Sequence, residues 1–454
     1  MSGETGGYDV GTREYVRGFR RNSNPCWLRA VQVLRARKAI DLSGAFSMVD
    51  LGCGSGFQLI ATAAAHPRAR FVGVDISPDH VVAARALAAA AEIRNVTFVE
   101  ASFDEIAARP ELVGEVDVAV AHGIWTWVSA EVQRALVQVL RGTLRTGGLL
   151  YLGYNAMPAW ASGAPLRKLV HLLAAGRRGE SREAAVSEAL ETLKFMRESK
   201  AGIAASDGAL GELIERLDGR PMGYLAHELL PSAGGGAWHV DVCDALEAAR
   251  LTYVGAAGLM DNFDQLIFPD AIAERIAAAE ASGLAETLRD FALSRSFRMD
   301  VFARGSLRLD GPATGAAIEA LPVAVASGDW WDGPLALTPW GRISLDEDLA
   351  AAAVAVMREG PRRLGEAAAA MAARGVDRRL AGQTLTVLLA AERLMPVLTL
   401  EPEPEAVAAC RRFNAAVLES GIVWPALASA VAGGGIEASR SARQALEGLG
   451  PVEE

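Results

Sequence analysis

The chain is poor in the features that mark secreted, membrane-spanning and nucleic-acid-binding proteins. Its 454 residues contain four cysteines, Cys26, Cys53, Cys243 and Cys410, none of them in a Cys-x-x-Cys pair. We therefore expect reduced, buried thiols rather than disulfides or a cysteine metal site. The formal net charge of −10 argues against general binding of nucleic acid, which needs lysine and arginine to neutralise phosphates.

Long apolar runs are also missing, although 51% of the residues are hydrophobic. No stretch of about 18 uncharged, strongly apolar residues occurs, so we expect no membrane span. The first seven residues lack a basic and apolar signal pattern, which predicts a cytoplasmic protein. At roughly 150 residues per domain, the length predicts two or three domains.

The sequence is organised around residues 46–65, an apolar run that three glycines interrupt. Asp50 is followed by Gly52, Gly54 and Gly56, and then by an alanine-rich stretch. A strand, a glycine turn and a helix start let backbone N–H groups approach a ligand, because glycine has no Cβ. A tight turn with no ligand is the alternative interpretation.

A second apolar strand, residues 70–75, ends on Asp75. In a doubly wound sheet an acidic residue at this place accepts hydrogen bonds from ribose hydroxyls, so the loop and Asp75 together predict a nucleoside site. The glycine spacing differs from the Gly-x-Gly-x-x-Gly pattern of dinucleotide sites, and Asp50 precedes it. This favours S-adenosyl-L-methionine over a nicotinamide cofactor, because a sulfonium amino acid has no pyrophosphate and tolerates an acidic neighbour.

Apolar strands alternate with helical stretches from residue 46 onward, which predicts a Rossmann-like α/β sheet. The expected strands are 46–51, 70–75, 96–100, 116–121 and 149–154. Ser77 and Pro78 predict the cap and first position of a helix that runs to Ala91. Ligands bind at the carboxyl ends of the strands in such sheets, so the residues just past each strand are candidates for the site.

Two aromatic segments follow the fourth and fifth strands, residues 122–128 and 154–160. Because the topology brings both to one crevice, His122 and Tyr154 are candidates for proton transfer, and Asn155 is a candidate for orienting a nucleophile.

The same segments contain three tryptophans. Trp125, Trp127 and Trp160 are candidates for holding an incoming cation against their ring faces. Packing in the core explains each of them equally well.

In this order, the glycine loop, Asp75 and the two aromatic segments resemble a class I S-adenosylmethionine-dependent methyltransferase that carries a methyltransferase regulatory domain. Residues 224–230 and 251–263 resemble the second conserved block of that subgroup. Its relatives include the rickettsial lysine methyltransferases that modify outer-membrane proteins. The resemblance extends over roughly residues 46–310.

The resemblance implies a set of cofactor contacts, and this chain departs from the family pattern at some of them. The expected cofactor-binding residues are Asp50, Gly52, Gly54, Gly56, Asp75, Ile76, Ser102, Phe103 and His122. Ser102 replaces an acidic residue that reaches the adenine amino group in the family, and Ser55 replaces a common aspartate. Adenine contacts are therefore less defined than ribose contacts.

The strand pattern stops after Trp160, and residues 163–218 have apolar positions three and four apart, as helices do. We interpret residues 161–238 as a helical insertion that lies over the fifth strand and acts as a substrate lid.

Three polar groups stand at the end of this insertion. We expect His227 and Glu228 to take part in proton transfer and His239 to bind substrate. Their spacing matches no strong metal-ligand pattern, so we expect no metal.

The ends of the chain are less distinctive. Residues 8–40 predict one or two helices, with Tyr8, Tyr15 and Phe19 as candidates for covering the cofactor. A basic cluster there is interpreted as a solvated helix face: Arg13, Arg17, Arg20 and Arg21.

Residues 251–254 predict the strand that completes the sheet, and residues 265–268 predict a further strand. Beyond residue 311 the order of helix, helix and two short strands is typical of a winged helix, a domain that the rickettsial relatives also have. The acidic run 401–405 favours protein or substrate docking over DNA. The expected domains are 1–45 (helical), 46–160 (cofactor-binding), 161–238 (insertion), 239–310 (completion of the sheet) and 311–454 (winged-helix-like).

The leading hypothesis is an S-adenosylmethionine-dependent methyltransferase that acts on a lysine-type nitrogen of a protein or peptide, with a homodimer as one option for its assembly. The sequence has no Asn/Asp-Pro-Pro-Tyr motif after the fourth strand, which argues against adenine-N6 and glutamine methylases. Two alternatives stay open. One is a small-molecule N- or O-methyltransferase, and the other is a non-catalytic cofactor-binding regulatory protein.

Overall fold

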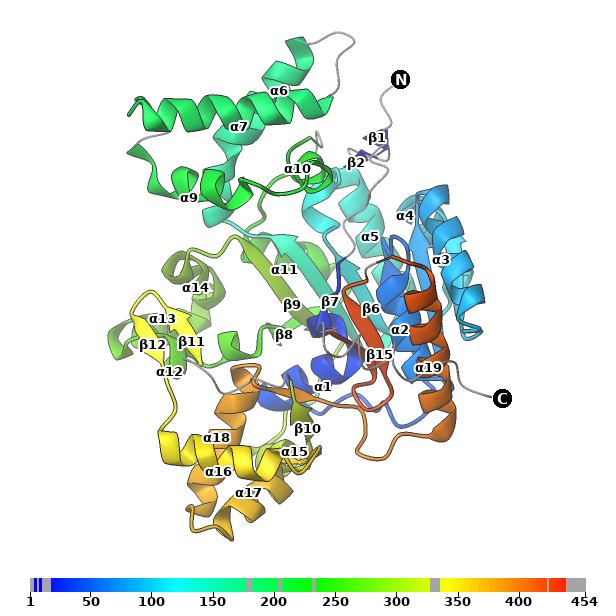
Figure 1. The fold of residues 1–454 in the computed structure, drawn as a ribbon, viewed down its shortest axis with the longest axis vertical. Coiled ribbons are helices and arrows are strands. Elements are labelled where there is room, and N and C mark those ends of the chain that lie inside the picture. Colours follow the sequence, from blue (N-terminus) through cyan, green and yellow to red (C-terminus); the bar gives the residue numbers. More distant parts are fainter. Residues whose placement is uncertain are drawn as a thin grey trace.

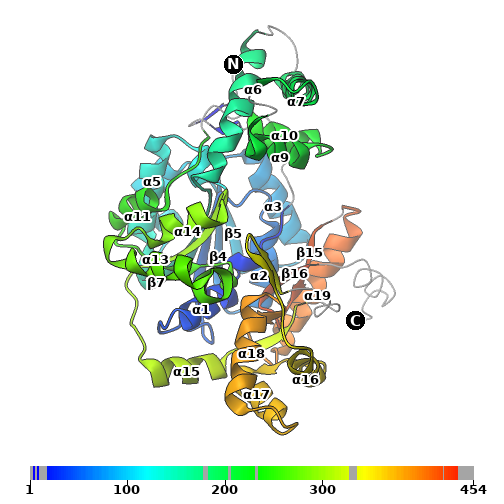
Figure 2. The same cartoon turned by 90° about the vertical axis from the view of Figure 1, so that its left-hand side faces the viewer.

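The computed structural model describes residues 4–5, 8–9, 18–176, 182–202, 206–230, 234–326, 335–422 and 424–437. A seven-stranded sheet forms its centre, with a helical region beyond one end of the strands and a second region of helices and short strands beyond the other (Figures 1 and 2). The strands of the sheet are β3 (Ser47–Leu51), β4 (Arg70–Asp75), β5 (Val96–Glu100), β6 (Val116–His122), β7 (Leu144–Asn155), β8 (Thr252–Ala256) and β9 (Phe297–Ala303).

The strand order is β5-β4-β3-β6-β7-β9-β8. The first five strands are parallel, and β9 runs antiparallel between β7 and β8. The chain moves outward from β3 to β5 and then returns to the other side of β3, so the order reverses between β3 and β6. Such a switch point opens a crevice at the carboxyl ends of the strands, which confirms the predicted Rossmann-like sheet.

Helices cover both faces of the sheet. One face packs against α1 (Pro25–Leu34), α2 (Phe57–Ala65) and α3 (Pro78–Ala90), and the other against α4 (Phe103–Ala108), α5 (Ala130–Thr143) and α11 (His239–Glu247). The N-terminus of α3 forms as predicted. The Ser77 Oγ accepts a hydrogen bond from the His80 N–H, and Pro78 takes the first helical position, where no N–H donor is needed.

Residues 164–229 form a separate group of helices above the sheet (Figure 1). Its described helices are α6 (Ala164–Gly176), α7 (Arg182–Glu198), α9 (Gly208–Leu217) and α10 (Met222–Leu229). Their apolar faces enclose a small core of their own, around Leu166, Leu190 and Ile214. Amphipathic helices outside the sheet become stable by burying one face against each other.

The C-terminal region combines helices with short strands. Its elements before residue 400 are α15 (Gly311–Ala320), β10 (Pro322–Val325), β11 (Ala336–Thr338), β12 (Gly341–Ile343), α16 (Glu347–Met357), β13 (Arg362–Arg363), α17 (Leu364–Ala372), α18 (Arg378–Ala390) and β14 (Leu394–Pro396). Strand β10 lies between β13 and β14, antiparallel to both. The winged-helix assignment stays a prediction. Side chains of this region share one continuous hydrophobic core with α1 and α2.

One local prediction was wrong. Residues 265–268 do not form a strand, because α12 (Asp264–Ile267) covers most of them and its end packs with α13 (Asp270–Ala278) and α14 (Ala285–Leu293) in a small apolar cluster. In the N-terminal segment, α1 forms one of the one or two helices predicted for residues 8–40, and β1 (Glu4–Thr5) and β2 (Tyr8–Asp9) pair as antiparallel strands ahead of it. The side chains of Tyr8 and Tyr15 lie outside the described residues. None of the described helices has the length and apolar character to cross a membrane.

Candidate active site

The glycine loop between β3 and α2 has the conformation that its glycines permit. Gly52, Gly54 and Gly56 have φ angles of 81°, 55° and 69°, in the left-handed region that disfavours residues with a Cβ. A Cβ at Gly52 would overlap the side chain of Ile124. The N–H groups of Gly52 and Cys53 donate to the carbonyl of Val74 on β4, at 2.8 and 3.0 Å. The loop is thus held against the end of the neighbouring strand.

Asp75, the last residue of β4, also holds the loop through hydrogen bonds of its carboxylate. Its Oδ2 accepts the N–H of Gly54 at 2.8 Å, and its Oδ1 accepts the N–H of Ser77 at 2.9 Å. The ring of His80 contacts Oδ1 at 3.2 Å. Ile76, between these residues, is half-buried. The carboxylate that we expect to meet a ribose is therefore fixed before any ligand arrives.

Asp50 lies at the end of β3, directly before the loop. Burial, and then the nearby carboxylate of Asp75, raise the pKa of Asp50 to about 7. Asp50 lines a small cavity of about 90 Å³ over the glycine loop. Arg20, Gln58, His122 and Trp424 are among its other walls. Within the described part of the chain, no donor is hydrogen-bonded to the Asp50 carboxylate.

Ser102 and Phe103 begin α4 past the end of β5. The Ser102 Oγ accepts the N–H of Glu105 at 3.2 Å, and the Glu105 carboxylate accepts the N–H of Ser102 at 2.8 Å. This reciprocal pair is a capping box, which satisfies two N–H groups of the helix start. Phe103 is half-buried and packs against the α4–α5 side of the core. The Ser102 hydroxyl therefore caps α4. In the family, the acidic residue at this position would contact adenine instead.

His122 ends β6 and is enclosed by two partners. The Arg20 Nε donates to its Nε2 at 2.9 Å, so the proton of the neutral ring lies on Nδ1 and donates to the Tyr151 hydroxyl at 3.0 Å. Burial, and then the charge of Arg20, lower the pKa of His122 to about 3. His122 is thus neutral at physiological pH in this arrangement, and it is a poor proton acceptor there.

Arg20 was misinterpreted from the sequence. The expected solvated helix face is not formed, because Arg20 contacts His122 and Arg21 forms an ion pair with Glu392 at 3.1 Å. Arg13 and Arg17 lie outside the described residues. Only the tertiary structure brings residues 18–24 over the glycine loop, and nothing in the local pattern distinguishes Arg20 from a surface arginine.

A second and larger cavity, of about 520 Å³, lies beside the first. Arg20 and His122 line both cavities, so the two adjoin. Strand ends and their neighbours form one side of the larger cavity: Asn155, Ser296, Phe297 and Met299. The helical insertion and the segment leading into it supply the opposite side, including Trp160, Arg167, Tyr224 and Glu228.

Two polar groups in this cavity lack partners within the described residues. Asn155 is 6% exposed, and its buried Nδ2 has no hydrogen-bond acceptor. Glu228 is half-buried, and its carboxylate forms no ion pair or hydrogen bond with a described side chain. Burial raises its pKa, and the charges of Arg167 and Arg216 act against this shift. Unpartnered buried polar groups are costly and rare in native proteins, so such groups in a cavity indicate a ligand site.

The tryptophans do not form an open cation site. The guanidinium of Arg167 lies 5.2 Å from the ring of Trp127 and 5.1 Å from that of Trp160. Trp125 is buried in the core, away from the cavity lining. The expectation that these rings hold an incoming cation therefore needs correction, because the protein's own Arg167 occupies the space between two of them.

Tyr154 and His239 lie on the opposite face of the sheet from this cavity. The Tyr154 hydroxyl donates to the Asp300 Oδ2 at 2.7 Å, and the His239 Nδ1 contacts the same oxygen at 3.1 Å. Both residues are fully buried, and burial raises the pKa of Tyr154 well above its usual range. Adjacent residues of a strand face opposite sides of its sheet, so the sequence itself could have shown that Tyr154 and Asn155 do not share a site. The His227 side chain lies outside the described residues.

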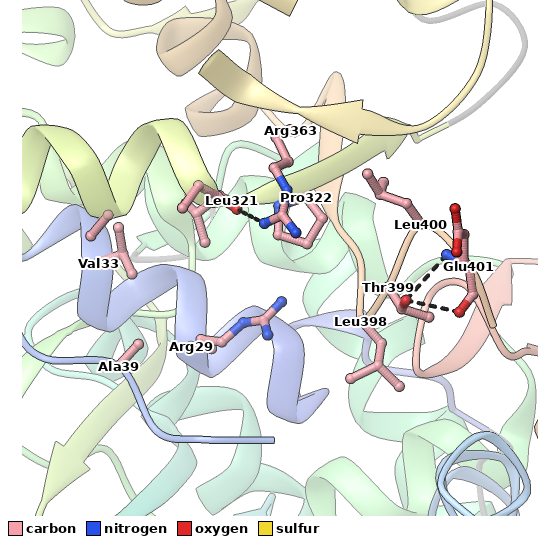
Figure 3. Close-up of a pocket in the computed structure, with 12 residues that line it drawn as sticks. Arg29, Val33, Ala39, Leu321, Pro322, Arg363, Leu398, Thr399, Leu400 and Glu401 are labelled. Atoms are coloured by element: carbon pink, nitrogen blue, oxygen red, sulfur yellow. Dashed lines mark hydrogen bonds between the residues drawn. The ribbon is translucent and has the colours of Figure 1, made fainter. Parts of the chain in front are cut away.

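A further cavity lies in another part of the molecule. It measures about 600 Å³ and lies between α1, α15 and residues 398–401 (Figure 3). Arg29 and Arg363 reach toward it, and each already donates to a backbone carbonyl, that of Val397 at 2.9 Å and that of Ala320 at 3.0 Å. None of the residues predicted to bind cofactor or substrate lines it. Within the described residues, no cluster of three His, Cys, Asp or Glu side chains is arranged to hold a metal ion.

The fold and the glycine loop define a class of protein. A seven-stranded sheet with β9 antiparallel, a loop of left-handed glycines, and acidic residues at the ends of β3 and β4 fit S-adenosylmethionine. The loop keeps backbone free of Cβ atoms where a ligand approaches, and the unpaired Asp50 suits a positively charged amino acid end.

Comparison with known families agrees. Residues 49–150 match a family described as a methyltransferase domain, and residues 221–304 match a predicted methyltransferase regulatory domain. The chain is therefore an S-adenosylmethionine-dependent methyltransferase with a regulatory domain of this type. S-adenosyl-L-methionine is its cofactor.

Individual relatives extend over most or part of the chain. An uncharacterized protein of Synechocystis sp. is 29% identical over 437 residues, which are 94% of this chain and 84% of that protein. Ribosomal protein L11 methyltransferase of Thiobacillus denitrificans is 38% identical over 115 residues, 25% of this chain and 33% of that protein. The structure of PKMT2 from Rickettsia typhi in complex with AdoHcy shares the fold, with a TM-score of 0.72, 19% identity, and coverage of 96% of this chain and 88% of that one.

Proposed function

We propose that this methyltransferase modifies a nitrogen, of the lysine amine type, in a protein or peptide. One observation carries the proposal: the half-buried carboxylate of Glu228, without a bonded partner among the described side chains, in the cavity that adjoins the cofactor pocket. A primary amine is positively charged in water, and a carboxylate partly shielded from solvent attracts it. The same carboxylate can then receive the proton that the amine must lose before it attacks.

The chemistry needs positioning more than strong acid–base groups. When bound, S-adenosylmethionine supplies a methyl group on a positively charged sulfur and leaves as a neutral thioether. Glu228 accepts the amine proton at its carboxylate, and its raised pKa makes it a better proton acceptor than an exposed glutamate. Asn155 orients the nitrogen through its side-chain amide, and Phe297 and Met299 keep water from the reacting atoms.

Arg20 and Asp50 hold the cofactor side of the site. The guanidinium of Arg20 offers positive charge to the cofactor's carboxylate, and Asp50 offers negative charge to its ammonium and sulfonium groups. His122 stays neutral and contributes its ring as a wall between the two cavities.

A macromolecular acceptor is favoured by the size and borders of the cavity. About 520 Å³ exceeds what one amine side chain fills, and part of the wall belongs to residues 161–238, which we propose as the substrate lid. The relative named ribosomal protein L11 methyltransferase has a protein as its named substrate. We further propose that residues 311–454, as a winged-helix-like unit, dock a protein substrate rather than DNA.

Labelled S-adenosylmethionine with the purified protein and a bacterial lysate tests the proposal. We expect label in polypeptide, released as methylated lysine after acid hydrolysis. Label confined to the small-molecule fraction would overturn the protein assignment. Absence of label, together with absence of S-adenosylhomocysteine binding in calorimetry, would support a non-catalytic protein.

The Glu228→Gln variant supplies the second arm of this test. It keeps the size of the side chain and removes the charge, so we expect cofactor binding without methyl transfer. Glu212→Gln is the matched control, because Glu212 is exposed on α9 of the same insertion.

A further inference from the structure

The C-terminal segment, residues 404–437, returns to the cofactor-binding part of the molecule. It consists of α19 (Pro404–Glu419) and the antiparallel hairpin β15 (Ala426–Ser429) and β16 (Gly434–Glu437). All three elements pack against α2, the helix that follows the glycine loop. In Figure 1, α19 and β15 lie beside α2, far from α16 and α17 of the region that precedes them.

Trp424, between α19 and β15, reaches the glycine loop itself. Its ring stacks on that of Phe57, the first residue of α2, with ring centroids 4.4 Å apart and an angle of 3° between the planes. Its Nε1 donates to the Ser420 Oγ at 3.2 Å. Trp424 is 7% exposed, and it lines the small cavity over the loop together with Gly52 and Ser55.

The hairpin also supports the segment that contributes Arg20. The Asn24 Nδ2 donates to the carbonyls of Ala432 and Gly433, at 3.2 and 3.1 Å. Gly435 lies so close to the ring of Phe19 that a Cβ there would overlap it. The buried ring of His66, just after α2, contacts the Gly433 carbonyl at 3.0 Å. Residues 19–24 and α2 are thus both anchored to the same hairpin.

We propose that Trp424 is a cofactor-binding residue, and that residues 404–437 form an integral wall of the methyl-donor pocket within the larger C-terminal unit. An indole beside the glycine loop supplies an apolar wall and an electron-rich ring face, both of which favour a sulfonium group over water. The inference rests on the cofactor assignment alone. It holds whether the methyl acceptor is a protein or a small molecule.

Calorimetry with S-adenosylmethionine and S-adenosylhomocysteine on the full chain tests this proposal. We expect Trp424→Leu to weaken the binding of both ligands about tenfold or more, and that of the charged sulfonium ligand the most. Trp424→Phe keeps an aromatic face and should stay within about threefold of wild type. Trp340→Leu is the control, because Trp340 is 41% exposed, contacts Phe268 and lines neither cavity of the active site.

Thermal unfolding without ligand separates loss of a contact from loss of the fold. If Trp424→Leu unfolds like wild type yet binds both ligands within twofold, the proposal is wrong. If that variant does not fold, fluorine NMR of the wild-type protein provides the test instead, with its nine tryptophans labelled as 5-fluorotryptophan. The fluorine resonance that Trp424→Phe removes should move on addition of S-adenosylhomocysteine, and an unmoved resonance would overturn the proposal.

Discussion

The two faces of the sheet at β7 and β9 differ in how their polar groups are used. On one face, Asn155 borders the 520 Å³ cavity, and its buried Nδ2 has no partner among the described residues. On the other face, Tyr154 and Arg298 both bond to Asp300, at 2.7 and 2.8 Å. Consecutive residues of one strand therefore belong to the proposed substrate site and to a buried ion network.

This difference separates groups that stabilise the fold from groups that we propose meet a ligand. Arg298 is 3% exposed and bonds to Asp290, Glu286 and Asp300. Burial alone would raise the pKa of Asp300, but Arg298 and His239 outweigh it and hold that pKa well below its usual range. At Glu228 burial raises the pKa, and the charges of Arg167 and Arg216 act against it. The two carboxylates differ in their bonded partners, because the Asp300 Oδ2 accepts from Tyr154 and Arg298 and contacts His239, whereas the Glu228 carboxylate has no bonded partner among the described side chains.

The largest effect on stability is expected at the centre of the network. Asp300→Asn keeps the shape of the side chain but leaves the charge of Arg298 less compensated, which should lower the free energy of unfolding by about 3 kcal/mol. Denaturant unfolding measures this free energy. The control is Asp104→Asn, at an exposed position of α4, which should change the free energy of unfolding by less than about 0.5 kcal/mol. A stable Asp300→Asn protein that has lost methyl transfer would contradict the division between the two faces.

The largest effect on turnover is expected at Glu228. Removing a proton acceptor costs about 100-fold or more in rate, so Glu228→Gln should lose methyl transfer to that extent. Its affinity for S-adenosylhomocysteine should stay within about twofold of wild type, since Glu228 does not line the cofactor pocket. Radiolabel transfer measures the rate of methylation, and calorimetry measures the affinity for S-adenosylhomocysteine. Weakened cofactor binding with unchanged turnover would show that Glu228 does not accept the amine proton.

Tyr154→Phe tests which face carries out the chemistry. The change removes one hydrogen bond to the charged Asp300, with an expected cost of about 1.5 kcal/mol in unfolding free energy. Turnover should stay within about twofold of wild type, because the hydroxyl does not reach the cavity. Asn155→Ala is the counterpart on the opposite face and should reduce turnover with less effect on stability. The reverse outcome would restore Tyr154 as a catalytic residue.

The smallest expected effect concerns Asp50, the carboxylate of the proposed cofactor pocket that has no hydrogen-bond donor among the described residues. Its folded-state pKa of about 7 lies above the usual value for aspartate, so its contribution to stability is fully present below about pH 4 and is lost as pH rises through 7. Asp50→Asn should therefore flatten the decline in ligand-free stability between about pH 4 and pH 8, and gain about 1 kcal/mol at pH 8. Thermal unfolding across this range measures both curves. Parallel curves for wild type and variant would show that Asp50 does not cause the decline in stability with rising pH.

The sequence by itself determined the features that depend on neighbouring residues. Three glycines after an apolar strand adopt left-handed angles wherever the strand lies, and Ser77 with Pro78 starts a helix through its own backbone. The order of strands then predicted the sheet and the nucleoside site. Strand β9 did not stand out, because the buried charges of Arg298 and Asp300 interrupt its apolar pattern.

Only the tertiary structure decided which polar residues meet. The sequence offered Tyr154 and Glu228 for proton transfer and Asn155 for orienting the nucleophile. Pairing of β9 with β7 gave Tyr154 a charged partner and left the Asn155 Nδ2 without a partner among the described residues. Arg20 and Trp424, about 400 positions apart, meet over the glycine loop because the C-terminal hairpin packs on α2. Such contacts arise from packing between distant segments, which no local pattern encodes.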